Sequence, residues 1–450
     1  MLSVSLVALD GTVLATAVPT IVGELGGFSL FPWLFSGYLL AQAVTTPLYA
    51  KLSDVFGRKP VILVGIGLFL VGSILCAAAW SMPALIVART VQGMGAGAVQ
   101  PMSVTIVGDI YSVAERARVQ GYIASVWAMA SVVGPTLGGL FAQLGIWRGV
   151  FVINVPFCLL AAWMMVRRFH ENTERGVRSV DYRGAALLIS ALTLLVLAIL
   201  GGGQTWAWDS AASIGAFAGG AVLLVVFCLA ARRTAEPILP GWVLTRRLLV
   251  TTTVVGLGVG AVLIGLTSYV PTYLEGSLRV SPVEAGLALT TLTIGWPLTS
   301  GLSGRIYLRI GFKKTALIGA ALVLTGTIAL LAVAHRPNVA VVAAMCFVTG
   351  CGLGLLALPS LIAAQSSVDW DERGVVSGTH MFARSLGSAV GVAVFGAIAN
   401  TFFGDGNVHT VGASAIQSGT AAVFLGVVVV AVAAAAAVVA MPPTPPVSTS

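Results

Sequence analysis

Long apolar segments constrain the fold of this chain more than any other feature of its sequence. Fourteen of them follow one another along 450 residues, and most approach the roughly 20 residues that cross a bilayer as a helix. Charged residues make up 9% of the chain, whereas about a quarter of a soluble domain is charged. So few charges cannot cover a soluble surface, and we predict an all-α, polytopic membrane protein. The runs lie at 2–22, 31–50, 61–80, 84–107, 119–143, 149–166, 184–202, 211–231, 249–274, 284–304, 315–334, 339–362, 376–399 and 420–441.

The basic residues indicate how these segments are oriented. If the chain starts in the cytoplasm and crosses the bilayer with every run, 19 of the 24 Lys and Arg fall in cytoplasmic connections. Only Arg148, Arg279 and Arg336 fall in outer connections. Basic residues are retained on the cytoplasmic side of membranes. We therefore expect a multi-pass protein of the inner (cytoplasmic) membrane with both termini in the cytoplasm, and no nucleic-acid partner for the formal charge of +8.

The positions of the cysteines and the first apolar run bear on disulfides, metal sites and a signal peptide. All five cysteines lie inside apolar runs, without the Cys/His spacing of a metal site. We therefore expect no disulfide, no metal and no other cofactor. The first run begins at residue 2, so we expect it to act as its own insertion signal rather than as a cleaved peptide. The Ala-, Gly- and Arg-rich composition indicates a bacterial source.

An internal repeat divides the chain into two halves. VQGMGAG (91–97) matches VTGCGLG (348–354) at an offset of 257, and GRKPVILVGIGL (57–68) matches GFKKTALIGAAL (311–322) at an offset of 254. Such repeats place a substrate site between the halves, near the midplane of the membrane. The predicted domains are an N-terminal six-helix bundle (1–168), two linker transmembrane helices with cytoplasmic flanks (169–248), a C-terminal six-helix bundle (249–441) and a disordered tail (442–450).

Five short motifs carry a family resemblance. In chain order they are ALDGTVLATAVPTI (8–21), YAKLSDVFGRKP (49–60), RTVQGMGAG (89–97), GPTLGG (134–139) and WRGVFVINVP (147–156). Together they resemble the signatures of the major facilitator superfamily. The first and fourth are similar to motifs of its fourteen-helix drug/proton antiporters, although Ala stands where the first motif usually has Asn.

The resemblance implies a fold and an activity. The fold is two six-helix bundles related by pseudo-twofold symmetry, with two extra central helices. The activity is proton-coupled efflux of lipophilic, cationic small molecules by alternating access, with protons, the substrate and the bilayer as partners and a monomer as the working unit. Three alternatives stay open: export of a lipid, siderophore or endogenous antibiotic on the same fold, a symporter or uniporter, and an intramembrane enzyme. The enzyme is disfavoured because the chain has neither G-x-S-x-G nor H-E-x-x-H.

The charged stretch around Gly57 predicts a cytoplasmic latch that helps to hold an outward-facing state. Gly57 permits a tight turn, and Asp54 can pair with Arg58 or Arg118, or accept backbone N–H groups. Topology signalling alone would explain Arg58 and Lys59 but not Asp54. In the second half, Leu308 stands at the position of Asp54, so that latch should be weak or absent. The predicted members are Asp54, Gly57, Arg58, Lys59, Asp109, Glu115, Arg116 and Arg118.

Four ionisable residues inside the apolar runs are candidates for proton coupling: Asp10, Arg89, His380 and Arg384. Each needs a reason, because a charge at mid-membrane costs at least about 2.5–3.5 kcal/mol. Burial raises a carboxyl pKa and a nearby cation lowers it, so Asp10 could take and release a proton. Helix packing is the alternative for Asp10, snorkelling for Arg89, and structural hydrogen bonding for His380 and Arg384.

Polar stripes at helical spacing predict the substrate cavity, with simple packing as the alternative. The predicted cavity residues are Tyr38, Gln42, Thr46, Gln92, Gln100, Trp127, Thr293 and Trp296. In the fifth run, Pro135 should kink the helix and the neighbouring small residues should allow close helix contact. This motif, expected to act as a pivot or seal, consists of Gly134, Pro135, Gly138 and Gly139.

Overall fold

The computed structural model describes residues 1–26, 32–111, 113–169, 171, 181–202, 206–234, 237, 240–280, 282–403 and 413–443. Each apolar run coincides with a helix, and the run at 149–166 is divided into two helices at Ile153. The helices are α1 (Leu2–Leu25), α2 (Pro32–Phe56), α3 (Arg58–Ala77), α4 (Met82–Ile110), α5 (Val113–Gln143), α6 (Gly149–Val152), α7 (Asn154–Arg168), α8 (Tyr182–Gly201), α9 (Ala211–Ala231), α10 (Arg247–Leu278), α11 (Pro282–Ile310), α12 (Phe312–Val333), α13 (Val339–Ser366), α14 (Arg373–Phe403) and α15 (Ala413–Ala440), with 3-10 turns η2 (Gly241–Leu244) and η3 (Trp370–Glu372).

Several helices extend beyond their apolar runs. Helix α5 begins at Val113 rather than at 119, because a polar first turn containing Glu115 precedes the apolar part. By length and composition, seven spans among the described residues are apolar enough to cross a membrane. They are Arg58–Ala77, Gly149–Arg168, Ala211–Ala231, Arg247–Leu278, Phe312–Val333, Val339–Ser366 and Ala413–Ala440.

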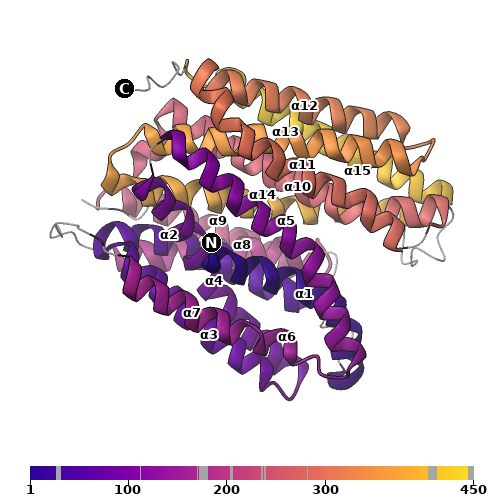
Figure 1. Cartoon of the computed structure of the whole chain (residues 1–450), viewed down its shortest axis with the longest axis horizontal. Coiled ribbons are helices and arrows are strands. Elements are labelled where there is room, and N and C mark those ends of the chain that lie inside the picture. The colour runs from indigo at the N-terminus through magenta and orange to yellow at the C-terminus, as the bar shows by residue number, and fades with distance from the viewer. Residues whose placement is uncertain are drawn as a thin grey trace.

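Two bundles account for most of the helix packing, and they are built alike (Figure 1). In the N-terminal bundle α4 packs on α2 and α3, and α1 packs on α5. In the C-terminal bundle α13 packs on α11 and α12, and α10 packs on α14. The turns repeat as well: Gly57 has φ 93° and ψ 163°, and Gly311 has φ 87° and ψ 162°. The internal repeat in the sequence therefore corresponds to a repeated three-dimensional arrangement.

The two bundles meet along two seams. Helix α2 contacts α14 at one seam, and α5 contacts α11 at the other. In the internal repeat, α2 of the first half corresponds to α11 of the second, and α5 corresponds to α14. The two seams are therefore equivalent by the pseudo-twofold relation between the bundles. Small residues allow the approach at the second seam, where a Cβ on Gly121 would lie 2.9 Å from the Cα of Gly301.

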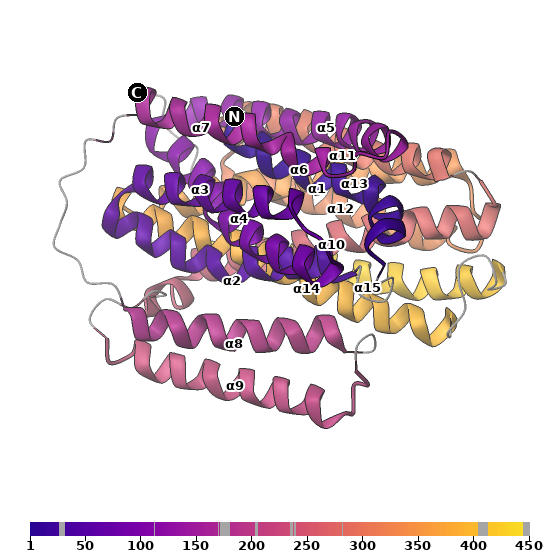
Figure 2. The same cartoon turned by 90° about the horizontal axis from the view of Figure 1, so that it is seen from below.

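The two central helices form a hairpin beside the bundles (Figure 2). Helix α8 lies along the first seam and contacts both α2 and α14. Leu188 of α8, Val44 of α2 and Phe382 of α14 belong to one apolar cluster. Helix α9 packs on α8, and its side chains Val222 and Val225 are exposed. The hairpin therefore bridges the bundles while α9 presents an apolar surface of the kind that faces lipid.

Candidate functional site

A buried carboxylate network occupies the interior of the N-terminal bundle. The Nη1 of Arg89 in α4 lies 2.6 Å from Oδ2 of Asp10 in α1. Gln92, one turn further along α4, donates from Nε2 to Asp10 Oδ1 at 2.8 Å. Asp10 and Arg89 are each 1% exposed. The structure therefore pairs Asp10 with Arg89, and Arg89 does not snorkel toward the membrane surface.

Two further members of this network were not among the sequence-predicted site residues. Asn154, at the start of α7, donates from Nδ2 to Asp10 Oδ1 at 3.0 Å. Ser73 of α3 accepts a 2.8 Å hydrogen bond from Gln92 Nε2. Four helices thus surround one carboxylate. A signal for Asn154 existed, since it lies in the WRGVFVINVP motif; Ser73 had no signal beyond its place in an apolar helix.

The surroundings of Arg89 complete the site. Its guanidinium carbon lies 4.2 Å from the ring centre of Tyr38, a cation–π arrangement. Tyr38 is 4% exposed and Gln92 is fully buried. The structure places both with Asp10 in the N-terminal bundle, and their roles as substrate contacts stay predictions. Chemically, the network gives Asp10 three side-chain donors, one of which is a cation.

The remaining predicted cavity residues lie on several helices. Gln42 donates to Gln100 at 2.6 Å, and Thr46 donates to the carbonyls of Gln42 and Gly97. Thr293 donates to the Thr290 carbonyl within its own helix. Trp127 and Trp296 are partly exposed and pack against the cores of the two different bundles. The structure brings Gln42, Thr46 and Gln100 together.

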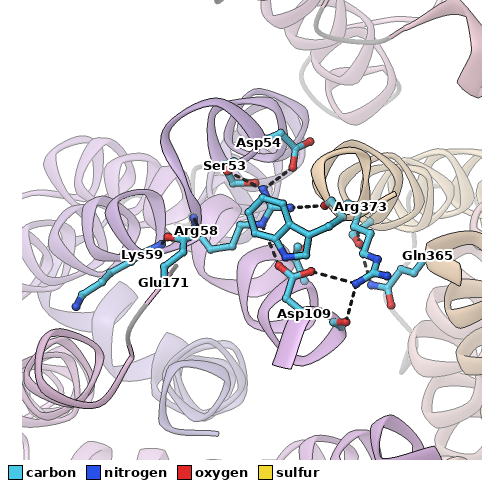
Figure 3. Close-up of polar contacts among 12 residues, drawn as sticks. Ser53, Asp54, Arg58, Lys59, Asp109, Glu171, Gln365 and Arg373 are labelled. Carbon is cyan, nitrogen blue, oxygen red and sulfur yellow. Dashed lines mark hydrogen bonds and ion pairs between the residues drawn. The ribbon is translucent and has the colours of Figure 1, made fainter. Parts of the chain in front are cut away.

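Arg58 is the centre of the latch (Figure 3). Its side chain is fully buried and makes ion pairs with Asp54 at 2.5 Å and Asp109 at 3.1 Å. It also donates to the Ser53 carbonyl at 2.7 Å. The predicted latch residues Asp54, Arg58 and Asp109 therefore meet, with Arg58 between the ends of α2 and α4.

The latch crosses from one bundle to the other. Arg58 Nη2 donates to the Trp370 carbonyl in η3 at 2.9 Å, and its guanidinium stacks over the Trp370 ring at 4.3 Å. Asp54 Oδ2 accepts the backbone N–H of Val375, in the first turn of α14, at 2.9 Å. Arg373 adds a 3.2 Å bond to the Gly108 carbonyl (Figure 3). These contacts join the bundles at their predicted cytoplasmic ends.

An unpredicted acid orders the turn around Gly57. Glu171, which follows α7, accepts the backbone N–H groups of Arg58 at 2.7 Å and Lys59 at 3.1 Å. It therefore caps the amino end of α3, where a negative charge is stabilising. Lys59 Nζ donates to the carbonyls of Val166 and Phe169 at the end of α7. Lys59 thus acts within the N-terminal bundle.

Substitution of Gly57 by Ala should destabilise the protein. The backbone φ of 93° is one that side chains rarely adopt, and a Cβ would lie 2.7 Å from Glu171 Oε2. Such backbone strain costs about 1–3 kcal/mol. We expect a lower melting temperature in thermal denaturation of the purified protein. Gly67→Ala, within the α3 helix that Gly57 precedes, is the control, because its added Cβ meets nothing within 4 Å. Equal melting temperatures of the two variants would contradict this explanation.

Not every predicted latch residue joins the latch. Arg118 is exposed and stacks near Tyr122, to whose hydroxyl it donates at 3.1 Å. Asp54 therefore pairs with Arg58, and the pairing with Arg118 is not formed. Glu115 is exposed in the first turn of α5. The side chain of Arg116 lies outside the described residues.

The glycine motif of α5 lies against α1. A Cβ on Gly134 would collide with Thr12 Oγ1, and Thr12 donates to the Ala130 carbonyl at 2.9 Å. Gly138 is buried, and Gly139 has open space beside it. The side chain of Pro135 lies outside the described residues, so its kink stays a prediction. Close packing within the N-terminal bundle is what this motif visibly provides.

Trp147 and Arg148, which precede α6, hold the predicted outer end of the same bundle together. Both donate at 2.6 Å to the carboxylate of Glu24 at the end of α1. The hydrogen bond from Arg148, followed by that from Trp147, lowers the pKa of Glu24 below its ordinary value. The WRGVFVINVP motif therefore binds α1 at two positions. Trp147 and Arg148 bind Glu24 near the end of α1, and Asn154 binds Asp10 in its interior.

The remaining predicted coupling residues lie in α14. His380 is 4% exposed and its Nδ1 has no hydrogen-bond partner among the described residues. Arg384 is half-buried. The described residues contain no group of three or more His, Cys, Asp or Glu side chains that could hold a metal.

Two repeated helical bundles, a buried ion pair in one of them and a charged contact between the bundles at one end are the features of a membrane transporter. The family model of the Major Facilitator Superfamily matches residues 1–392. The chain belongs to this superfamily, and it is a transporter rather than an enzyme.

Several proteins with similar sequences are named as drug or efflux transporters. The chain is 32% identical to the multidrug transporter protein MdtP of Bacillus subtilis, covering 88% of this chain and 74% of that protein. It is 33% identical to multidrug resistance protein 3 of the same organism, covering 90% and 79% respectively. The efflux pump dotC of Dothistroma septosporum is 28% identical, with 87% and 69% covered. The relatives are thus multidrug and efflux transporters.

Solved structures share the fold at low sequence identity. The human organic anion transporter MFSD10 aligns with a TM-score of 0.67 at 19% identity, over 96% of this chain and 97% of that chain. The proton:xylose symporter XylE aligns with a TM-score of 0.62 at 14% identity, over 95% and 92%. At these sequence identities, the two similarities show a shared fold and nothing about function.

Proposed function

We propose that this protein is a proton-coupled exporter of lipophilic small molecules, with fourteen membrane spans and both termini in the cytoplasm of a bacterium. The carrying observation is the Asp10–Arg89 pair at 2.6 Å, enclosed by Gln92 and Asn154. A carboxylate held this deeply among polar partners has a protonation state that depends on how those partners are arranged. A change of arrangement during transport is therefore able to bind or release a proton.

The mechanism follows from the two bundles and the latch. With the cytoplasmic ends joined through Arg58, Trp370, Asp54 and Val375, the chamber can open only to the outside. Protonation of Asp10 from that side weakens its attraction to Arg89, which loosens α1 against α4. One bundle then tilts against the other, and the latch separates. A proton moving inward yields about 2.3 kcal/mol per 100 mV, enough for roughly a fiftyfold gradient of a neutral substrate.

The lipophilic nature of the substrate has better support than its predicted positive charge. The relatives are multidrug and efflux transporters, which agrees with an apolar cargo. A cationic cargo would need an accessible acid, whereas Asp10 is 1% exposed and already bound by three side chains. Export of a lipid, siderophore or endogenous antibiotic uses the same fold and stays the alternative.

Purified protein in proteoliposomes tests the coupling. Vesicles containing a pH-sensitive dye are diluted into buffer at equal pH, and a lipophilic dye is added on the side from which it is exported. A coupled antiporter should release protons in proportion to the dye that it moves. Dye movement without proton movement, even under an imposed pH gradient, would contradict coupling. A panel of a monovalent dye, a neutral lipophile and a lipid separates drug export from lipid export.

A further inference from the structure

The membrane helices of the two bundles differ in their charge. In the N-terminal bundle the positive charge of Arg89 is balanced by Asp10. In the C-terminal bundle Arg384 lies within α14, and the sequence contains no Asp or Glu at 285–368 or at 374–404. The apolar part of the C-terminal bundle therefore contains a cation and no acid.

Helix geometry places Arg384 at the interface between the bundles. Met381 of α14 is buried with Val104 of α4 and Leu361 of α13, so this face of α14 meets the other bundle. Arg384 is three residues further along and lies on the same face. Gln100 precedes Val104 by four residues on α4 and is hydrogen-bonded to Gln42. Next to the apolar contact of Met381 with Val104, toward the predicted outer side, α4 therefore presents Gln100 with its partner Gln42. At the same level α14 presents Arg384.

Arg384 is also unneutralised. Among the described residues, its guanidinium forms no ion pair with a carboxylate, and its side chain is half-buried. His380 lies one turn away, faces α10 beside Gly256, and keeps its buried Nδ1 without a partner. A lone cation in such a place is costly. A bound anion from outside the chain would stabilise the charge of Arg384.

We propose that Arg384 forms an anion-binding site between the bundles, which takes the carboxylate or sulfonate of an amphipathic organic acid. The planar guanidinium suits two-point binding of such a group, and the apolar residues around Met381 suit the rest of the molecule. This proposal rests on the proposed export function and names the substrate class for it. The same charge disfavours an organic cation at this position.

Two dyes with the same xanthene body but opposite charge test the proposal: carboxyfluorescein and tetramethylrhodamine methyl ester. The full-length protein is placed in phosphatidylcholine nanodiscs, and binding is followed by fluorescence polarisation. We expect the wild type to bind carboxyfluorescein about tenfold more tightly than the cationic dye. Arg384→Gln should weaken the anion by about tenfold and leave the cation unweakened, whereas Arg384→Lys should retain most anion binding.

Controls keep the outcome interpretable. Arg336→Gln removes the same charge at an exposed position outside the helices and should bind both dyes like the wild type. If Arg384→Gln does not fold, displacement on the wild type decides: octanesulfonate should displace carboxyfluorescein, and octyltrimethylammonium should not. Absent or equal anion binding, or unchanged affinity in Arg384→Gln, overturns the proposal. If the binding contrast holds but proteoliposomes show no proton-coupled export, the proposed function fails and the anion site stands.

Discussion

Substitution of Asp10 by Asn should abolish proton-coupled export while preserving the shape of the side chain. Asn keeps the size of Asp but can neither bind a proton nor carry the negative charge that pairs with Arg89, whose Nη1 lies 2.6 Å from Asp10 Oδ2. In proteoliposomes, we expect substrate-dependent proton release to fall to background and the pH dependence of export to disappear. Export that keeps its pH dependence in Asp10→Asn would show that the coupling proton binds elsewhere.

A second variant separates lost coupling from lost stability. Asp10→Asn leaves Arg89 charged and fully buried, and an ion pair broken in this way costs about 3–5 kcal/mol. The double variant Asp10→Asn/Arg89→Gln removes both charges, so its melting temperature should recover toward that of the wild type. Its proton coupling should stay absent. Recovery of coupling together with stability would mean that Asp10 serves only to hold helices together.

Substitution of Arg58 by Gln should release the bundles from each other at their predicted cytoplasmic ends. It removes the bonds to Trp370, Asp54 and Asp109. Asp54 then loses its ion pair with Arg58, while Asp109 keeps its ion pair with Arg373 at 3.7 Å. Water can reach these acids when the latch opens, so the variant favours the open arrangement. The lost charged hydrogen bond to Trp370 alone is worth about 1.5–3 kcal/mol, roughly a ten- to hundredfold change in the equilibrium. We expect export to drop below about a tenth of the wild-type rate.

Thiol labelling measures this change directly. In a chain without its own five cysteines, Met381→Cys puts a thiol at a buried position between the bundles. Arg58→Gln should increase its labelling by a water-soluble maleimide about tenfold or more from the cytoplasmic side. Lys59→Gln is the matched control, since the side chain of Lys59 donates to carbonyls of its own bundle. Equal labelling in the two variants would contradict a latch centred on Arg58.

The sequence predicts the helices well and the partners of site residues only in part. Apolar runs set by the bilayer mark the position of each helix, while polar end turns extend α2, α5, α11 and α15 by six or seven residues beyond their runs. Helical spacing puts Arg89 and Gln92 on one face of α4, which is why both meet Asp10. Tyr38 shows the limit of such spacing, because a stripe of polar residues does not tell whether it faces a chamber or the interior of its own bundle.

Partners from distant parts of the chain were missed for identifiable reasons. Glu171 belongs to a linker without periodicity, so nothing in its neighbourhood predicts that it caps α3. Trp370 binds Arg58 through a backbone carbonyl, which no side-chain pattern reports. Ser73 is one hydroxyl in an apolar helix. Asn154 could have been selected, because a polar amide at the start of a buried helix needs a hydrogen-bond partner.

The position of α8 has a consequence for the symmetry of the whole protein. Helix α8 lies along the α2–α14 seam and contacts both of these helices. The equivalent α5–α11 seam has no such companion among the described helices. Within the described part of the chain, the hairpin therefore covers one seam between the bundles and leaves the equivalent seam without a covering helix. Although its two halves are built alike, the protein presents two different flanks to the lipid, and the added hairpin makes that difference.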